Sequence, residues 1–172
     1  MTFPSDLLLM KFKILNLVMF QLGWAICVLG GNLMAVAFSV IALLIHQRYV
    51  LQSKSEWKLV GFIVLVGITW DSLLVFLGLI VYPDAVWFSL PVWMVCLWVL
   101  FATTFMHSLA WLSGYLWLSV ILGAVFGPMS YWAGVELSGA SFGESSIMSM
   151  AVIAAGWAIL FPTGLYMTGR FK

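Results

Sequence analysis

The sequence predicts an all-α protein that crosses a membrane several times, as a single domain over residues 1–172 built from six transmembrane helices. Hydrophobic residues make up 65% of the chain and charged residues only 8%, whereas soluble domains average about 25% charged residues. The mean hydropathy is +1.15. Several apolar stretches reach about 20 residues, which is the length that crosses the hydrocarbon core of a bilayer. These observations predict a polytopic membrane protein.

The first two predicted helices come from one apolar stretch. Residues 14–45 are almost continuously apolar, which is too long for one crossing of about 20 residues. The Gly-Gly-Asn sequence at residues 30–32 is a turn signal inside this stretch. We therefore expect one helix at about residues 11–29 and a second at about residues 33–50.

Polar or proline-containing segments separate the other helices. HQRYVLQSKSEWK follows the second helix, YPDAVWFSLP the third, SGY the fourth and SGASFGESS the fifth. The remaining helices are expected at about residues 57–82, 91–112, 115–137 and 147–167. No repeated segment can be aligned, so an inverted-repeat transporter fold is not favoured.

The basic residues predict the orientation of the helices. With six crossings, all seven fall on one side of the membrane: Lys11, Lys13, Arg48, Lys54, Lys58, Arg170 and Lys172. The other side carries Asp84 and Glu144 and no basic residue. Cytoplasmic loops are enriched in Lys and Arg, so both termini are predicted to be cytoplasmic.

Charge and motifs exclude several functions. The net charge is +1 and the basic residues are spread over three sites, so no nucleic acid partner is expected. The sequence has no P-loop, GxSxG, HExxH or CxxCH motif. No metal site is predicted, because Asp71, His107 and Glu136 do not supply enough ligands at one depth. No cofactor is identified, and whether the protein is an enzyme stays open, since a cofactor can bring its own reactive atoms.

Asp71 is the centre of the predicted site. Counting 1.5 Å per residue from Tyr82 places it near the bilayer midplane. An ionised Asp costs about 2.5–3.5 kcal/mol there, so it should face the bundle interior, either protonated, hydrogen-bonded or lining a watery cavity. It would then serve either as an interhelical hydrogen-bond donor or as a binding or proton-exchange group. The polar or irregular positions expected at or near this depth are Gln21, Thr103, Thr104, Gly127 and Pro128.

Other residues at membrane depth have two interpretations each. His107 either bonds a neighbouring carbonyl near the interface or connects to Asp71 through a relay at Thr104. Deeper tryptophans such as Trp98 either wall a cavity for a flat or acyl ligand or fill the core. His46 is assigned to the edge of the polar loop and to no site.

The fifth predicted helix contains a small-residue step and a proline. Gly123 and Gly127 form a GxxxG pattern, which favours close packing against another helix. Pro128 leaves the carbonyl of Ala124 without its helical donor. That carbonyl needs another partner in lipid, so the break is either a packing feature or a kink that contacts a ligand.

Four segments together resemble one protein family. NLVMFQLGWAICVLG, GITWDSLLVFLG, PVWMVCLWVLFATTFMHSLAWL and GAVFGPMSYWAG are similar to the DUF2878 family of small bacterial membrane proteins, over about residues 16–143. The family has no known biochemical function, and some members carry an unverified label as manganese or zinc permease components. Its association with cyclopropane-fatty-acid-synthase-like methyltransferases implies membrane-lipid modification. The positions that match, without an established role, are Asp71, Trp93, Trp98, Thr104, Ser108, Trp111, Gly127, Pro128 and Tyr131.

We therefore predict a multi-pass protein of the bacterial inner membrane that binds a lipid or other small hydrophobic molecule, as a component of fatty-acyl modification. The alternatives are a proton- or cation-coupled permease for a small solute or divalent metal, and a non-catalytic scaffold for a peripheral enzyme. The expected partners are membrane lipids and a peripheral lipid-modifying enzyme, and the oligomeric state stays open. The predicted ligand-binding or proton-exchange residues are Asp71, Thr103, Thr104, His107, Gln21, Trp98, Gly127, Pro128 and Tyr131.

Overall fold

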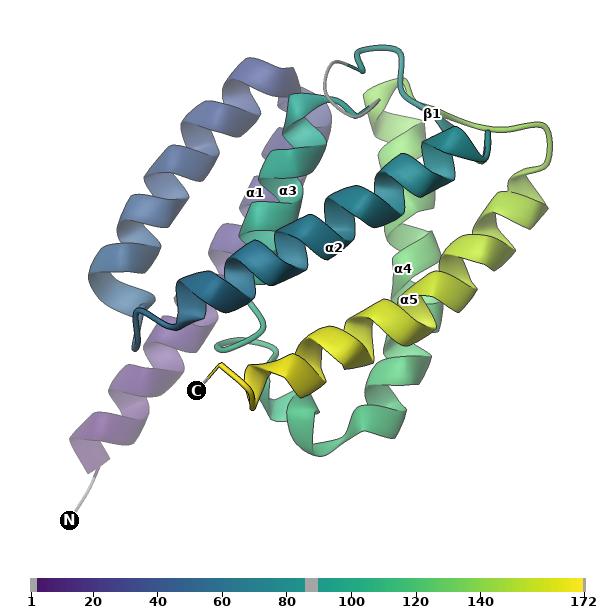
Figure 1. Cartoon of the computed structure of the whole chain (residues 1–172). Helices are drawn as coiled ribbons and strands as arrows, with labels where there is room; N and C mark the ends of the chain where they lie inside the picture. The colour runs from purple at the N-terminus through teal and green to yellow at the C-terminus, as the bar shows by residue number, and fades with distance from the viewer. Residues whose placement is uncertain (1–2, 86–89, 172) are drawn as a thin grey trace.

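The computed structural model describes residues 3–85 and 90–171. This part of the chain forms α1 (Phe3–Ile45), α2 (Glu56–Phe76), α3 (Val92–Ala102), α4 (Leu116–Ser138) and α5 (Ser146–Thr168) (Figure 1). It also contains the π-helical turn η1 (His46–Val50), the 3₁₀-helix η2 (Ala110–Gly114), and the short antiparallel strands β1 (Ile80–Val81) and β2 (Ser141–Phe142). The prediction of an all-α class is confirmed.

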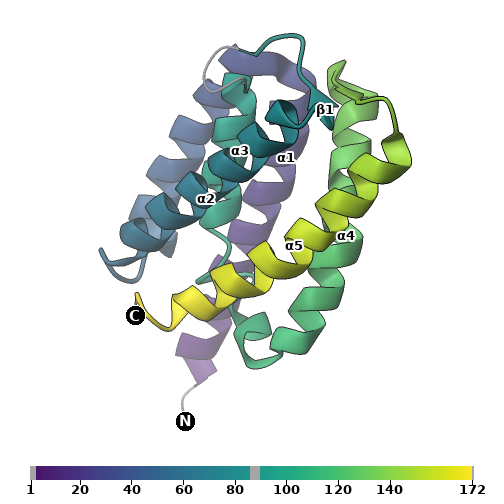
Figure 2. The same cartoon turned by 45° about the vertical axis from the view of Figure 1, so that its right-hand side comes forward.

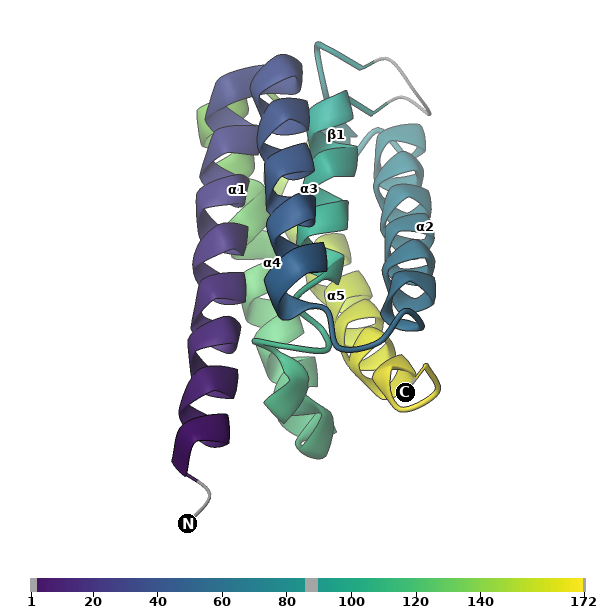
Figure 3. The same cartoon turned by 90° about the vertical axis from the view of Figure 1, so that its left-hand side faces the viewer.

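Helix α1 turns back on itself. Gly31 has φ 67° and ψ −171°, a backbone conformation that glycine adopts without steric penalty. Figure 3 shows the two halves of α1 running side by side in opposite directions. The sequence predicted two helices, at residues 11–29 and 33–50. The structure has one interrupted element with its turn inside the predicted Gly-Gly-Asn segment, so the described residues form five α-helices rather than six.

Helix α2 ends earlier than the predicted helix at residues 57–82. Gly78 adopts φ 67°, and the chain then enters β1, which pairs with β2 through Ile80 and Phe142. The predicted depth of Asp71 was counted from Tyr82, whereas α2 ends at Phe76. Asp71 therefore lies nearer to the β1–β2 end of the bundle than a midplane position would place it.

Helix α3 is also shorter than the predicted helix at residues 91–112. Its first turn is tied to the α1 turn, because the side-chain oxygen of Asn32 accepts a hydrogen bond from the Trp93 N–H at 3.0 Å. At its other end the backbone tightens into three-residue turns, such as Thr104 N–H to the Phe101 carbonyl at 2.9 Å. Residues 103–109 are not α-helical, and η2 follows them. The predicted loop at residues 82–91 includes residues 86–89, which lie outside the described part.

The last two helices were predicted almost correctly. The expected ranges, 115–137 and 147–167, differ from α4 and α5 by one residue at each end. The packed pairs are α4 with α5, α3 with α1 and α3 with α2. Figures 1 and 2 show the β1–β2 pair at one end of the bundle, with the start of α1 and the end of α5 toward the other.

The helices have the length and composition of membrane-spanning segments. Within the described residues, four are long and apolar enough to cross a bilayer: Leu7–Val50, Glu56–Phe76, Leu116–Ser138 and Ser146–Thr168. Helix α3 is a shorter apolar helix. Large apolar side chains such as Leu33 and Phe76 are more than 80% exposed on the outside of the bundle, as expected for surfaces that contact lipid.

Candidate functional site

Asp71 faces the interior of the bundle and joins three helices. Its side chain is 1% exposed. One carboxylate oxygen accepts a hydrogen bond from the indole N–H of Trp98 on α3 at 2.5 Å, and the other accepts one from the hydroxyl of Tyr131 on α4. Buried polar groups need such partners. The arrangement links α2 to α3 and α4 through a single side chain.

The partners of Asp71 differ from those that the sequence suggested. The Thr103 and Thr104 hydroxyls donate to carbonyls three residues earlier in their own chain segment, at 2.7 and 2.6 Å. Gln21 is exposed on α1. The residues that contact Asp71 are Trp98 and Tyr131, and both were among the predicted site residues. Trp98 was predicted as part of a cavity wall and Tyr131 as a position that matches the family, and neither was predicted to donate a hydrogen bond to Asp71.

Trp98 is held between two helices. A Cβ atom added at Gly67 of α2 would lie 2.1 Å from the Trp98 ring, so only glycine leaves room for the indole there. Trp98 also stacks on Trp157 of α5, with 5.5 Å between ring centroids and 17° between ring planes. The hydrogen bond to Asp71 then fixes the rotation of the ring in this slot.

Trp98 and Tyr131 form part of the wall of a large cavity. The cavity measures about 570 Å³, which is within the 300–1,000 Å³ range typical of small-molecule sites. Its lining is mainly apolar and comes from α1, α3, the segment after α3, α4 and α5. Among the predicted residues, Gln21, Trp98, Thr104, Gly127 and Tyr131 line it, while Asp71 lies behind the wall.

Some residues of α1 and α4 that line the cavity are also exposed on the outside of the bundle. Leu17 on α1 is 44% exposed, and Phe126 and Met129 on α4 are 58% and 51% exposed, although all three line the cavity. The Trp24 indole donates to the Ser130 hydroxyl at 3.2 Å and links α1 to α4 beside the cavity, which both residues line.

Few polar groups reach the cavity. Tyr82, in the segment between α2 and α3, also lines it. Burial, and secondly the charge of Asp71, raise the pKa of Tyr82 well above its usual value, so its hydroxyl stays neutral. The site therefore offers a mainly apolar surface with isolated hydroxyl and amide groups, which suits a hydrophobic ligand.

The GxxxG step and the proline that the sequence predicted as special features both lie within α4. Gly123 and Gly127 face Trp157, since a Cβ atom added at either glycine would lie 2.4 Å from an atom of that residue. This confirms the prediction that the GxxxG step packs closely against another helix. Pro128 is buried within α4, which continues through it.

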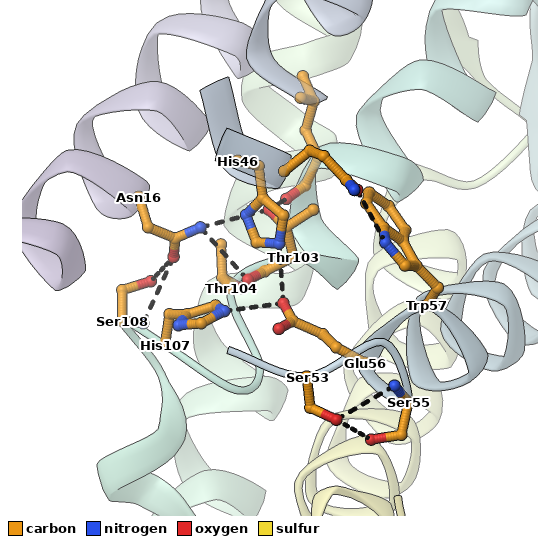
Figure 4. Close-up of polar contacts among 12 residues, drawn as sticks. Asn16, His46, Ser53, Ser55, Glu56, Trp57, Thr103, Thr104, His107 and Ser108 are labelled. Atoms are coloured by element: carbon orange, nitrogen blue, oxygen red, sulfur yellow. Dashed lines mark hydrogen bonds and ion pairs between the residues drawn. The ribbon is translucent and has the colours of Figure 1, made fainter. Parts of the chain in front are cut away.

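A second polar cluster lies at the other end of α2. Nε2 of His46 and Nε2 of His107 each lie 2.8 Å from the same oxygen, Oε1 of Glu56. The three side chains are 4%, 3% and 2% exposed. Figure 4 shows both imidazole rings directed at the Glu56 carboxylate from different segments of the chain. These are ligand-type side chains whose donor atoms lie within 4.8 Å of one another, so they could hold a metal ion.

Irregular backbone positions both histidines of this cluster. His46 begins the π-helical turn η1, and His107 lies in the non-helical segment at residues 103–109. Asn16 of α1 fastens that segment on both sides of His107. Its amide donates to the Thr103 carbonyl at 3.2 Å, and its oxygen accepts from the Ser108 hydroxyl at 2.7 Å (Figure 4).

The sequence did not identify this cluster. His46 was assigned to a loop edge, Glu56 was not considered, and His107 was expected to bond a carbonyl or to connect with Asp71. His107 instead bonds Glu56. A usable signal was present, because consecutive antiparallel helices meet at the same side of a bundle. The end of the second predicted helix and the start of the third therefore place His46 and Glu56 at the same end of the bundle.

Comparison with known protein families identifies the family of this chain. The family described as "Protein of unknown function (DUF2878)" matches residues 13–163. The chain belongs to this family, as the resemblance of its four segments indicated. No curated protein and no solved structure matches it.

Proposed function

We propose that this DUF2878 protein binds an acyl lipid or a similar small hydrophobic molecule in the cavity beside Trp98 and Tyr131. The observation that carries the proposal is the cavity of about 570 Å³, which is mainly apolar and lined in part by exposed residues of α1 and α4. An acyl chain can enter such a site from the bilayer without passing through water. A role as a component of membrane fatty-acyl modification, together with a peripheral lipid-modifying enzyme, is part of the proposal.

In this proposal Asp71 positions the cavity wall and does not touch the ligand. It holds the Trp98 indole and the Tyr131 hydroxyl from behind. The parts of the cavity wall that α3 and α4 contribute thereby keep a fixed separation. Pre-formed walls favour binding, because the ligand does not have to order them.

A cavity-filling variant tests the proposal. Gly134 of α4 lines the cavity, and a Cβ atom added there meets no atom within 4 Å, so Gly134→Leu should occupy cavity space without a backbone clash. Gly61→Leu is the matched control, because Gly61 is equally open but is exposed on α2. The probe is a palmitate analogue that carries a photoreactive diazirine, added to the purified chain in detergent.

We expect peptides of α1 and α4 to be crosslinked in the wild type and in Gly61→Leu. Crosslinking should fall about tenfold in Gly134→Leu, as expected when an overpacked site loses about 1.4 kcal/mol of binding. Equal labelling of the two variants would refute binding in this cavity. Peptide mass spectrometry of the crosslinked protein makes the comparison.

The alternatives predict other results. A proton- or cation-coupled permease should lose uptake in Asp71→Asn while its palmitate labelling is unaffected by Gly134→Leu. A scaffold should tolerate both changes and lose its enzyme partner when Arg48, Lys54 and Lys58 are neutralised.

We further propose that the chain crosses the bacterial inner membrane six times, with both halves of α1 spanning it and both termini in the cytoplasm. The reversal at Gly31 and the positive residues at one end support this topology. Gln52 and Glu144 are exposed in segments at opposite ends of the bundle. In intact cells, a membrane-impermeant maleimide should label Glu144→Cys and leave Gln52→Cys unlabelled. The wild type, whose Cys27 is buried and Cys96 partly buried, is the control. Labelling of Gln52→Cys would contradict cytoplasmic termini, and equal labelling of the two variants would contradict six crossings.

A further inference from the structure

We propose that His46, Glu56 and His107 form a binding site for a divalent transition-metal ion, with Zn²⁺ as the best-matched ion. This site is separate from the lipid cavity and does not depend on the proposed function. Two imidazole nitrogens and one carboxylate oxygen are a ligand set that binds zinc in proteins and leaves a fourth position for water.

The geometry is close to that of a bound site. In a tetrahedral site with metal–ligand distances of about 2.0 Å, neighbouring ligand atoms lie about 3.3 Å apart. Both Nε2 atoms lie 2.8 Å from the Glu56 oxygen, so each histidine needs to move away from Glu56 by only about half an ångström, and all three ligand atoms lie within 4.8 Å of one another.

The charge of the cluster also favours a cation. Glu56 is 2% exposed, and both ion-pair partners recorded for it within the described residues are histidines. With neutral imidazoles the cluster carries one buried negative charge, which is unfavourable in a bundle surrounded by lipid. A divalent ion compensates this charge, and it binds through Nε2 of each neutral imidazole when the ring proton is on Nδ1.

The backbone around the ligands supports a binding role. Non-helical backbone within membrane helices is tolerated where it is buried in protein or lines a cavity, and π-helical turns are frequent at functional sites. His107 lies in the non-helical segment at residues 103–109, and His46 begins the π-helical turn η1. The Asn16 hydrogen bonds to Thr103 and Ser108 hold the His107 segment in place from α1. Ligands fixed in this way lose little conformational freedom when they bind an ion.

The test uses the whole chain, purified without a polyhistidine tag, stripped with a chelator and reloaded with Zn²⁺ alone. Elemental analysis after dialysis should give one zinc ion per chain. His46→Gln, Glu56→Gln and His107→Gln should each weaken zinc binding at least about 100-fold, because removal of a ligand costs more than removal of an outer partner. Glu144→Gln, an exposed acid at the other end of the bundle, should bind like the wild type.

An X-ray absorption spectrum of zinc-loaded wild type does not depend on the folding of any variant. Scattering from two imidazole rings and a nitrogen–oxygen first shell supports the site. Substoichiometric zinc, a spectrum without two imidazoles, or unchanged binding in folded ligand variants overturns it. Palmitate labelling is expected to persist in zinc-free protein, so failure of this site and failure of the lipid cavity are distinguishable.

Discussion

Glu56→Ala is expected to lower the free energy of unfolding more than removal of an exposed acidic side chain. The substitution leaves Nε2 of His46 and of His107 without the acceptor that both share. Each buried hydrogen-bond donor that loses its acceptor lowers the free energy of unfolding by about 1–3 kcal/mol, and this substitution affects two such donors. Chemical unfolding in detergent, with a chelator present so that bound metal does not contribute, measures the effect.

The matched variants separate the hydrogen bonds from the loss of a charge. Glu56→Gln keeps a side-chain oxygen at the same place and should recover part of the stability. Glu144→Ala removes an exposed carboxylate and should change the free energy of unfolding by less than about 0.5 kcal/mol. If Glu56→Ala were as mild as Glu144→Ala, the histidines would not depend on Glu56 for their pairing.

Hydropathy and turn signals were sufficient to predict the helical class. They located the reversal near Gly31 and the ranges of α4 and α5, because these depend on local composition. The early ends of α2 and α3 depend instead on distant contacts. β1 pairs with a strand about 60 residues later in the chain, and Asn16 binds the segment that follows α3. Apolar composition continues through both segments, so the sequence alone predicted longer helices.

The two polar clusters were predictable to different degrees. An acid such as Asp71 within an apolar run must face inward because lipid does not solvate it. Its actual donors, Trp98 and Tyr131, depend on how α3 and α4 are rotated about their axes, which composition does not determine. His46 and Glu56 flank one short connection, so the antiparallel topology could have predicted that they lie near each other. They were not considered because both were assigned to the polar loop. The approach of His107 follows from the irregular segment after α3 and could not be foreseen.

Gly123→Ala is expected to destabilise the packing of α4 on α5. A Cβ atom at this position would lie 2.4 Å from the carbonyl oxygen of Trp157, which belongs to the backbone and cannot rotate away. The two helices would have to separate, and overpacking of this kind costs about 1–3 kcal/mol. Trp157 also stacks on Trp98, so the near-ultraviolet circular dichroism of the tryptophans should change together with the unfolding midpoint in detergent.

Gly134→Ala is the control on the same helix. A Cβ atom there meets nothing within 4 Å, so the change should be neutral or should stabilise α4 by about 0.5–1 kcal/mol through helix propensity. The two substitutions add the same methyl group to the same helix and differ only in what lies opposite. A lower free energy of unfolding in Gly123→Ala but not in Gly134→Ala would therefore report the contact at Trp157 itself. Equal effects would mean that α4 and α5 are not in contact at Gly123, and the cavity wall that Trp157 completes would have to be placed elsewhere.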